Sequence, residues 1–420
     1  MMEKYSEQGE WDFRGENTKQ YTHCFHIYPA MMIPQIAREL ITRFGKEGGV
    51  LFDPYCGTGT SLVEARIAGM DAFGTDINPT ARMIAKSKTM DYNLIELKKS
   101  VDSFLEDIEK NLELSTDYKK FKEPDFVTWD RLEDWFPKRS IAEISYALSS
   151  IENNNDTETK IFLKIALSEC LRLVSYQRNG EFKLYRMKEE KRQDFYESLL
   201  PKIKQRIQRN LEGLEDFMRV ISEERKVKIF DFNTVETDGF SQIDIPVDIV
   251  VTSPPYGDSG TTVAYAQFSW LSNVWLGLDD QSPGALDRKL MGGGKQTIDK
   301  FGFQPMDDAI QEISNVDEKR AKDVMHFYDE YLQSMKNVAS RINKGGYSCY
   351  VVGNRTVKGI QLPTDQFTAW AFNNEGFEHQ STYIREIPNK RMPSKNSPSN
   401  KKGIKSSTMS NEYIVICKKA

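Results

Sequence analysis

Apolar residues along the chain follow two spacings, and the two alternate. Short apolar runs typical of buried strands occur at 49–52, 71–74, 226–230, 243–251, 347–352 and 412–417. Between them, apolar residues recur at the spacing of amphipathic helices over 30–44, 61–68, 265–278, 327–342 and 367–377. Strands that alternate with helices predict an α/β fold, here a Rossmann-like mixed sheet.

The segment between the second and third predicted strands is long and highly charged. Its pattern is mostly helical, with candidate helices over 97–112, 161–173 and 189–217. We interpret 94–225 as a helical insertion. The chain then divides into 1–93, the insertion, and 226–420, whose predicted helix over 327–342 would end at Lys344-Gly345-Gly346.

Composition narrows the class of protein. The 420 residues are 39% hydrophobic and 28% charged, which suits a globular core. No apolar run reaches the length of a membrane span, and the first residues carry no signal-peptide pattern. The five scattered cysteines indicate reduced thiols in a cytoplasm, and the four histidines form no metal-ligand pattern. The net charge of −5 restricts any nucleic-acid surface to a local patch.

A Gly-rich turn follows the first predicted strand. It reads Asp53-Pro54-Tyr55-Cys56-Gly57-Thr58-Gly59-Thr60 and leads into a helix, and the second strand ends at Thr75-Asp76-Ile77. Glycines let a ligand approach the backbone, and an acid about 20 positions further on can bind ribose hydroxyls. The turn therefore predicts a site for a nucleoside-bearing ligand; the alternative is an ordinary strand-to-helix connection.

A second turn follows the strand over 243–251. Its residues Ser253-Pro254-Pro255-Tyr256 cannot continue a ladder, because neither proline has an N–H to donate. The turn leaves the Pro254 carbonyl and the Ser253 hydroxyl as acceptors beside the flat ring of Tyr256. Those groups suit a planar molecule with an exocyclic amine, although a turn without chemistry has the same pattern. Because ligands bind at the carboxyl ends of such strands, we expect this turn to lie near the Gly-rich turn, Asp76 and Asp231.

Two segments concentrate positive charge. One lies in the insertion and interleaves basic and aromatic residues, among them Arg178, Lys183 and Arg186. The other, 385–408, is rich in Pro, Ser and Asn and includes Lys390, Arg391 and Lys395. Both are candidates for contact with a phosphate backbone, and both could equally be solvated surface.

Three motifs together resemble the S-adenosylmethionine-dependent amino methyltransferases of DNA, in their N4-cytosine branch. They are the Asp53 to Thr60 turn, the segment Thr252 to Tyr256, and an N-terminal His26-x-Tyr28-Pro29-Ala30. The likeness covers about 20–90 and 226–356. Where the family often has a lysine after the alanine, this chain has Met31.

The resemblance implies a class I methyltransferase sheet and S-adenosylmethionine as cofactor. It implies methyl transfer to cytosine N4 in double-stranded DNA by base flipping, at a specific site and with a possible cognate restriction endonuclease as partner. Ser253 and Pro254 would accept from the amine, Pro255 would complete the turn and Tyr256 would stack on the base. The cofactor-binding residues would be Tyr28, Pro29, Asp53, Pro54, Cys56, Gly57, Gly59, Thr60, Asp76 (ribose), Ile77, Asp231 (adenine) and Asn233.

Three other functions fit the same motifs. RNA guanine-N2 methyltransferases share a Gly-rich turn and a Pro-Pro-Tyr-Gly turn, but Ser253 before the prolines favours cytosine N4. Adenine N6 is another possible acceptor. A non-catalytic DNA-binding subunit with a relic pocket is a third, against which the intact Ser253 and Tyr256 argue.

Overall fold

The fold is built on one seven-stranded sheet in the order β3-β2-β1-β4-β5-β11-β8. The computed structural model describes residues 9–113, 124–178, 182–221, 225–257, 264–278, 283–292, 299–387, 395–396, 406–407 and 411–420. The strands are β1 (Val50–Asp53), β2 (Asp71–Thr75), β3 (Val227–Phe230), β4 (Val247–Thr252), β5 (Ile342–Val352), β8 (Phe377–Glu386) and β11 (Asn411–Lys419). Two small ribbons pair β6 (Thr356–Val357) with β7 (Ile360–Gln361) and β9 (Lys395–Asn396) with β10 (Ser406–Ser407).

The first five strands of the sheet are parallel, and β11 runs against both of its neighbours, β5 and β8. The predicted mixed α/β sheet is therefore confirmed, with the strand order of class I methyltransferases. Because β1 lies between β2 and β4, the turns that follow these strands meet at one edge of the sheet.

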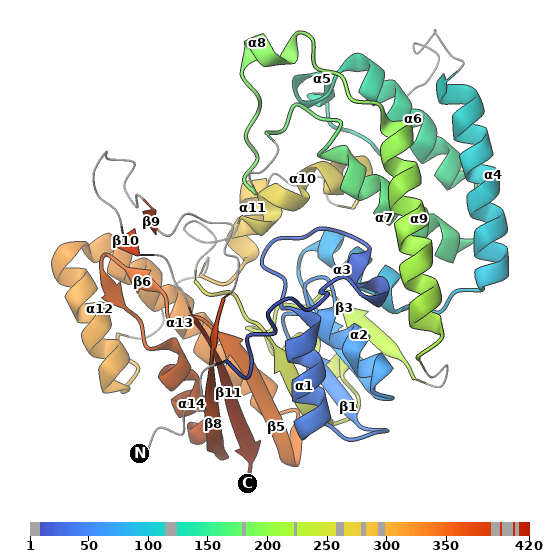
Figure 1. Ribbon diagram of the computed structural model, residues 1–420. Coiled ribbons are helices and arrows are strands. Elements are labelled where there is room, and N and C mark those ends of the chain that lie inside the picture. Colours follow the sequence, from blue (N-terminus) through green and yellow to red (C-terminus); the bar gives the residue numbers. More distant parts are fainter. Residues whose placement is uncertain are drawn as a thin grey trace.

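Alternating side chains build a core on each face of the sheet. Leu51 and Ile249 pack with α1 (Pro34–Phe44) and α2 (Thr60–Ile67). Phe52 and Val250 pack on the other face, in the core that helices α12 (Gln304–Val316), α13 (Glu318–Ala339) and α14 (Thr364–Asn374) complete. Figure 1 shows these two helical layers on either side of the strands.

A third core holds the insertion together. The insertion contains α4 (Leu94–Glu113), α5 (Leu132–Trp135), α6 (Lys138–Glu152), α7 (Thr157–Leu171), α8 (Glu189–Arg192) and α9 (Leu199–Met218). Its core also takes side chains from η1 (Tyr21–Cys24), α3 (Pro79–Thr89) and α10 (Tyr265–Trp275); the short α11 (Pro283–Lys289) follows α10. In Figure 1 these helices form a lobe beside the sheet. The insertion thus packs on segments that follow both predicted turns, and the division into three parts stays a prediction.

Some local predictions were wrong. The helix α13 ends at Ala339, and Lys344-Gly345-Gly346 lies inside β5, where Gly345 has a φ of 79° that suits an irregular strand. The expected helix over 189–217 is divided into α8 and α9. The strand β8 was missed because it is an edge strand with few buried residues, so its sequence contains no apolar run.

Candidate active site

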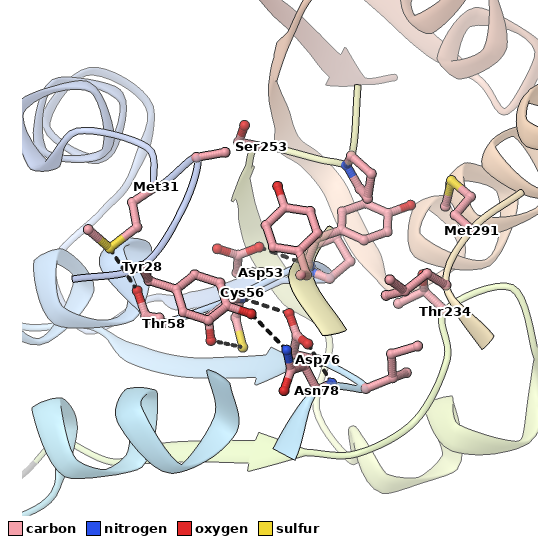
Figure 2. Close-up of a pocket in the computed structure, with 18 of the residues that line it drawn as sticks. Tyr28, Met31, Asp53, Cys56, Thr58, Asp76, Asn78, Thr234, Ser253 and Met291 are labelled. Carbon is pink, nitrogen blue, oxygen red and sulfur yellow. Dashed lines mark hydrogen bonds between the residues drawn. The ribbon is translucent and has the colours of Figure 1, made fainter. Parts of the chain in front are cut away.

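A pocket opens where β1, β2, β3 and β4 end. It encloses about 970 Å³ of empty space, the open mouth included. Figure 2 shows Met31 and Thr58 at one end and Thr234 and Met291 at the other, with Asp76 and Asn78 between them and Ser253 on the opposite side from Asp76. An elongated pocket at the carboxyl ends of parallel strands is the place where a class I methyltransferase holds its cofactor.

Asp53 joins the two predicted turns. Its Oδ1 accepts hydrogen bonds from the Tyr55 N–H at 3.1 Å and from Thr252 Oγ1 at 2.6 Å, and Oδ2 accepts from the Ser61 hydroxyl. Burial raises the pKa of the Asp53 carboxyl to about 6, although these hydrogen bonds oppose the shift. Because Thr252 precedes Ser253, the contact fixes the end of β4 relative to the Gly-rich turn.

Asp76 is fixed in the pocket by backbone groups. Its Oδ2 accepts from the Gly57 N–H at 3.0 Å, and its Oδ1 accepts from the Asn78 N–H at 2.7 Å. Burial raises the pKa of this carboxyl, against the nearby Arg82 charge and those two bonds. Each carboxylate oxygen keeps a further lone pair, so Asp76 can still accept from a ligand hydroxyl.

Gly59 shows why the turn needs glycine. It precedes α2 with a φ of 79°, in the left-handed region, and a Cβ added there would lie 2.9 Å from the Cβ of Ala85. A side chain at this position would push α2 away from α3.

The segment around Tyr28 covers one side of the pocket. Asn78 Nδ2 donates to the Tyr28 hydroxyl and to Ser269 Oγ, both at 2.8 Å, and Tyr28 stacks on Tyr265. Burial raises the pKa of Tyr28 well above its usual value. Met31 also lines the pocket, and its Sδ accepts a hydrogen bond from the Thr58 hydroxyl at 3.2 Å.

The Ser-Pro-Pro-Tyr turn is held by residues far along the chain. Ser253 Oγ lies 3.1 Å from the Tyr256 hydroxyl, which lies 2.9 Å from Glu412 Oε1 in β11. The second oxygen of Glu412 pairs with the guanidinium of Arg385 in β8, whose Nε donates to the Trp11 carbonyl at 3.1 Å. Burial, with Glu412 adding to it, raises the pKa of Tyr256 well above its usual value.

Most of the predicted site residues line the pocket. Twelve of the sixteen do so: Tyr28, Pro29, Asp53, Pro54, Cys56, Gly57, Thr60, Asp76, Ile77, Asn233, Ser253 and Pro255. The other four are outside the lining: Gly59, Asp231, Pro254 and Tyr256.

Asp231 is the predicted residue that the structure places worst. Its side chain is 73% exposed, lies 3.9 Å from Arg82 and is not among the residues that line the pocket. Phe232, Asn233 and Thr234 line that end instead. The end of β3 was placed correctly from sequence, but the face that each residue presents was not.

Sequence reasoning also missed several lining residues. Asn78, Thr234, Tyr265 and Met291 all contact the pocket, and none belongs to a recognised motif. Asn78 alone carried a signal, since Asn before Pro79 is a typical start of a helix, and its side chain does cap α3.

The candidate DNA-binding residues fall in different regions. Arg178 and Arg186 are exposed. An antiparallel β-bridge pairs Gln177 with Arg186, and Arg186 also lies 3.8 Å from Asp134. Lys183 is half-buried in the same hairpin, which Leu184 ties to Gln267 of α10. Lys390 and Arg391 lie outside the described residues, as does the side chain of Lys395 in β9.

The predicted basic segment 385–408 begins too early, because Arg385 does not belong to an exposed basic surface. Arg385 is only 5% exposed and paired with Glu412, so it cannot serve as a phosphate contact. Within the described residues, no cluster of His, Cys, Asp and Glu is suited to a metal ion. The same part of the chain contains no helix long and apolar enough to cross a membrane.

Comparison with known proteins finds similarity to DNA methyltransferases. A family model described as DNA methylase matches residues 3–87. The type II methyltransferase M.MvaI of Kocuria varians is 38% identical over 432 residues, 97% of this chain and 93% of that protein. M.MjaII of Methanocaldococcus jannaschii, also a type II methyltransferase, is 25% identical over 57% of this chain and 56% of its own length. A tRNA (guanine(10)-N2)-dimethyltransferase of the same organism is 33% identical over 72 residues, 17% of this chain and 20% of that protein.

The chain therefore belongs to the type II DNA methyltransferases of the N6/N4 methylase family. It is a methyltransferase, its cofactor is S-adenosylmethionine and its substrate is DNA. The pocket fits that cofactor. It is elongated, it has a buried carboxylate oriented by two N–H groups where hydroxyls can bind, and it offers apolar side chains at both ends.

Proposed function

We propose that this chain methylates the exocyclic N4 amine of cytosine in duplex DNA. The observation that carries the proposal is that Ser253, beside two prolines, lies on the wall of the same pocket as Asp76 and the Gly-rich turn. An acceptor for an amine and a cofactor site therefore share one cavity. The hydrogen bond from Thr252 to Asp53 supports this, since it holds the two turns together.

Each part of the pocket has a role in this proposal. Gly57 and Thr58 would hold the methionine portion of the cofactor, and Asp76 would accept from the ribose hydroxyls. Phe232, Asn233 and Thr234 would contact the adenine, and Tyr28 and Pro29 would cover the pocket. Bound S-adenosylmethionine supplies an electrophilic methyl group on a sulfonium, which is a good leaving group.

The residues of the second turn would position the target base. A base inside a duplex is out of reach, so the cytosine must leave the stack to enter the pocket. Ser253 Oγ and the Pro254 carbonyl would accept from its amine, and the ring of Tyr256 would stack on it. Positioning of this kind supplies much of the rate in a direct transfer and needs no covalent enzyme intermediate.

Methyl transfer from tritiated cofactor, followed by nucleoside analysis, tests the proposal. Duplex DNA and RNA are offered in parallel, and we expect label in N4-methylcytosine of DNA alone. Label in N6-methyladenine would replace the proposed acceptor with the alternative one. Label in RNA, or none at all, would contradict the proposal entirely.

We further propose that the target is held by the two basic segments. A chain with a net charge of −5 needs local positive charge to neutralise phosphates. Neutralising Lys390, Arg391 and Lys395 together should weaken DNA binding and flatten its salt dependence by about 0.9 for each phosphate that the variant no longer neutralises. A matched variant neutralises Arg178, Lys183 and Arg186. Unchanged salt slopes in the first variant would assign binding to the insertion, and unchanged slopes in both would exclude these segments.

A further inference from the structure

The contacts behind the Ser-Pro-Pro-Tyr turn form a chain in which the direction of every proton is set. It runs from Arg385 through Glu412 and Tyr256 to Ser253, and Ser253 is one of the residues that line the pocket. Arg385 is buried and its guanidinium is a donor only. The carboxylate of Glu412 is an acceptor only, so the Tyr256 hydroxyl must donate to it.

That first step fixes the rest. A phenol has one proton, and here it is committed to Glu412, so the Tyr256 oxygen can only accept from Ser253. Ser253 then donates its own proton to Tyr256, and its oxygen keeps lone pairs alone for a molecule in the pocket. Only a group with an N–H or O–H can bind there favourably.

We propose that Glu412 is a specificity-determining residue, which acts through Tyr256 to make Ser253 an acceptor that selects bases with an exocyclic amine. The inference rests on the proposed function. In it, Glu412 is the residue that allows the site to distinguish an amine from a carbonyl oxygen. Cytosine carries an amine where uracil carries a carbonyl, and adenine differs from hypoxanthine in the same way. A base with a carbonyl at this position is rejected because its oxygen and the Ser253 oxygen are both acceptors, and each would be left without a donor.

Two substitutions should change the chain differently. Tyr256→Phe keeps a ring for stacking but frees the Ser253 proton, so Ser253 can donate or accept. Glu412→Gln should reverse the chain. Arg385 would take the single amide oxygen, the amide N–H₂ would donate to Tyr256, and Tyr256 would donate to Ser253, whose proton would then turn toward the pocket.

The test measures preference for the amine. The target base is first mapped with the parent enzyme, and duplexes are then made with that base or its carbonyl counterpart, uracil for cytosine or hypoxanthine for adenine. Affinities are measured with S-adenosylhomocysteine present. The preference is the ratio of the affinity for the amine duplex to the affinity for the carbonyl duplex. We expect Tyr256→Phe to lower this ratio by about tenfold, the scale of one hydrogen bond, and Glu412→Gln to lower it further. The free energy needed to flip the base out of a given duplex is the same for the parent and the variants, so it cancels when the same duplex is compared between them.

Glu386→Gln is the matched control. This residue follows Arg385 in the sequence, is half exposed and pairs with Arg14, so its variant should keep the parent's preference. Cofactor affinity and thermal midpoint report on folding, and Tyr256→Phe keeps the test valid if Glu412→Gln is unstable, since it leaves the pair of Glu412 with Arg385 intact.

An unchanged preference in Tyr256→Phe, whether or not its single-turnover rate falls, would overturn the inference and leave Tyr256 as a stacking ring. If the mapped target is adenine, the proposed cytosine function fails while the hypoxanthine comparison still judges the role of Glu412.

Discussion

The two turns that share the pocket are held in opposite ways. Apart from the contact between Thr252 and Asp53, the Gly-rich turn is fixed by its own neighbourhood: Ser61 binds Asp53 from 8 positions away, and Asp76 binds Gly57 from 19. The Ser-Pro-Pro-Tyr turn depends on Glu412, which is 156 positions from Tyr256. The difference teaches that the cofactor side is a local motif and the base side is an assembly of distant segments. Substitutions should therefore separate binding of the cofactor from transfer of the methyl group.

The largest separation should come from Ser253→Ala. Loss of one positioned hydrogen bond in a transition state should lower turnover by about ten- to a thousandfold. Cofactor affinity should barely change, because Ser253 takes no part in holding the Gly-rich turn. Single-turnover methylation and calorimetry measure the two quantities. A parent-like transfer rate would remove Ser253 from the mechanism.

Asp76→Ala should give the opposite result. We expect it to weaken S-adenosylmethionine binding by about 1.5–3 kcal/mol, the scale of a hydrogen bond to a charged group. Asp231→Ala is the matched control, because its exposed carboxylate lies outside the pocket lining and should be dispensable. Calorimetry decides between them. Equal affinities in Asp76→Ala and the parent would mean that the ribose is held elsewhere, and a weaker affinity in Asp231→Ala would return that residue to the site.

Gly59→Ala should test how locally the first turn is built. Its Cβ would meet Ala85 at 2.9 Å in a left-handed conformation, so we expect the free energy of unfolding to fall by about 2 kcal/mol. Gly57→Ala has positive φ but nothing within 4 Å of the added atom, and its free energy of unfolding should fall by about 1 kcal/mol. Denaturant unfolding without cofactor measures both. Equal decreases would show that the contact with α3 is unimportant.

A final substitution tests the contact that joins the two turns. Thr252→Val removes the hydroxyl that donates to the Asp53 carboxylate, and the free energy of unfolding should fall by about 1.5–3 kcal/mol, the scale of a hydrogen bond to a charged group. Because this bond belongs to both turns, cofactor affinity and transfer rate should fall together, while Thr252→Ser should retain both. A fall in only one of them would show that the turns are held independently.

The same difference explains what could be predicted from the sequence. The strand-turn-helix pattern at Asp53 to Thr60 and the acid at Asp76 follow from short spacings, and all but Gly59 of the motif residues named there line the pocket. Glu412 and Arg385 could not be found, because their roles depend on the pairing of β11 with β8. That edge strand has no apolar run, and Arg385 was grouped by charge with residues of the basic segment.

The shared core of the helical lobe has a thermodynamic consequence. Helix α3 begins just after Asp76, and α10 begins a few residues beyond the second turn, yet both bury side chains among the helices of the insertion. A ligand that shifts this lobe has a route through the shared core to both turns. Such coupling is reciprocal, since a change that DNA makes in cofactor affinity equals the change that the cofactor makes in DNA affinity. Measuring either one alone would give the coupling free energy between the two ligands.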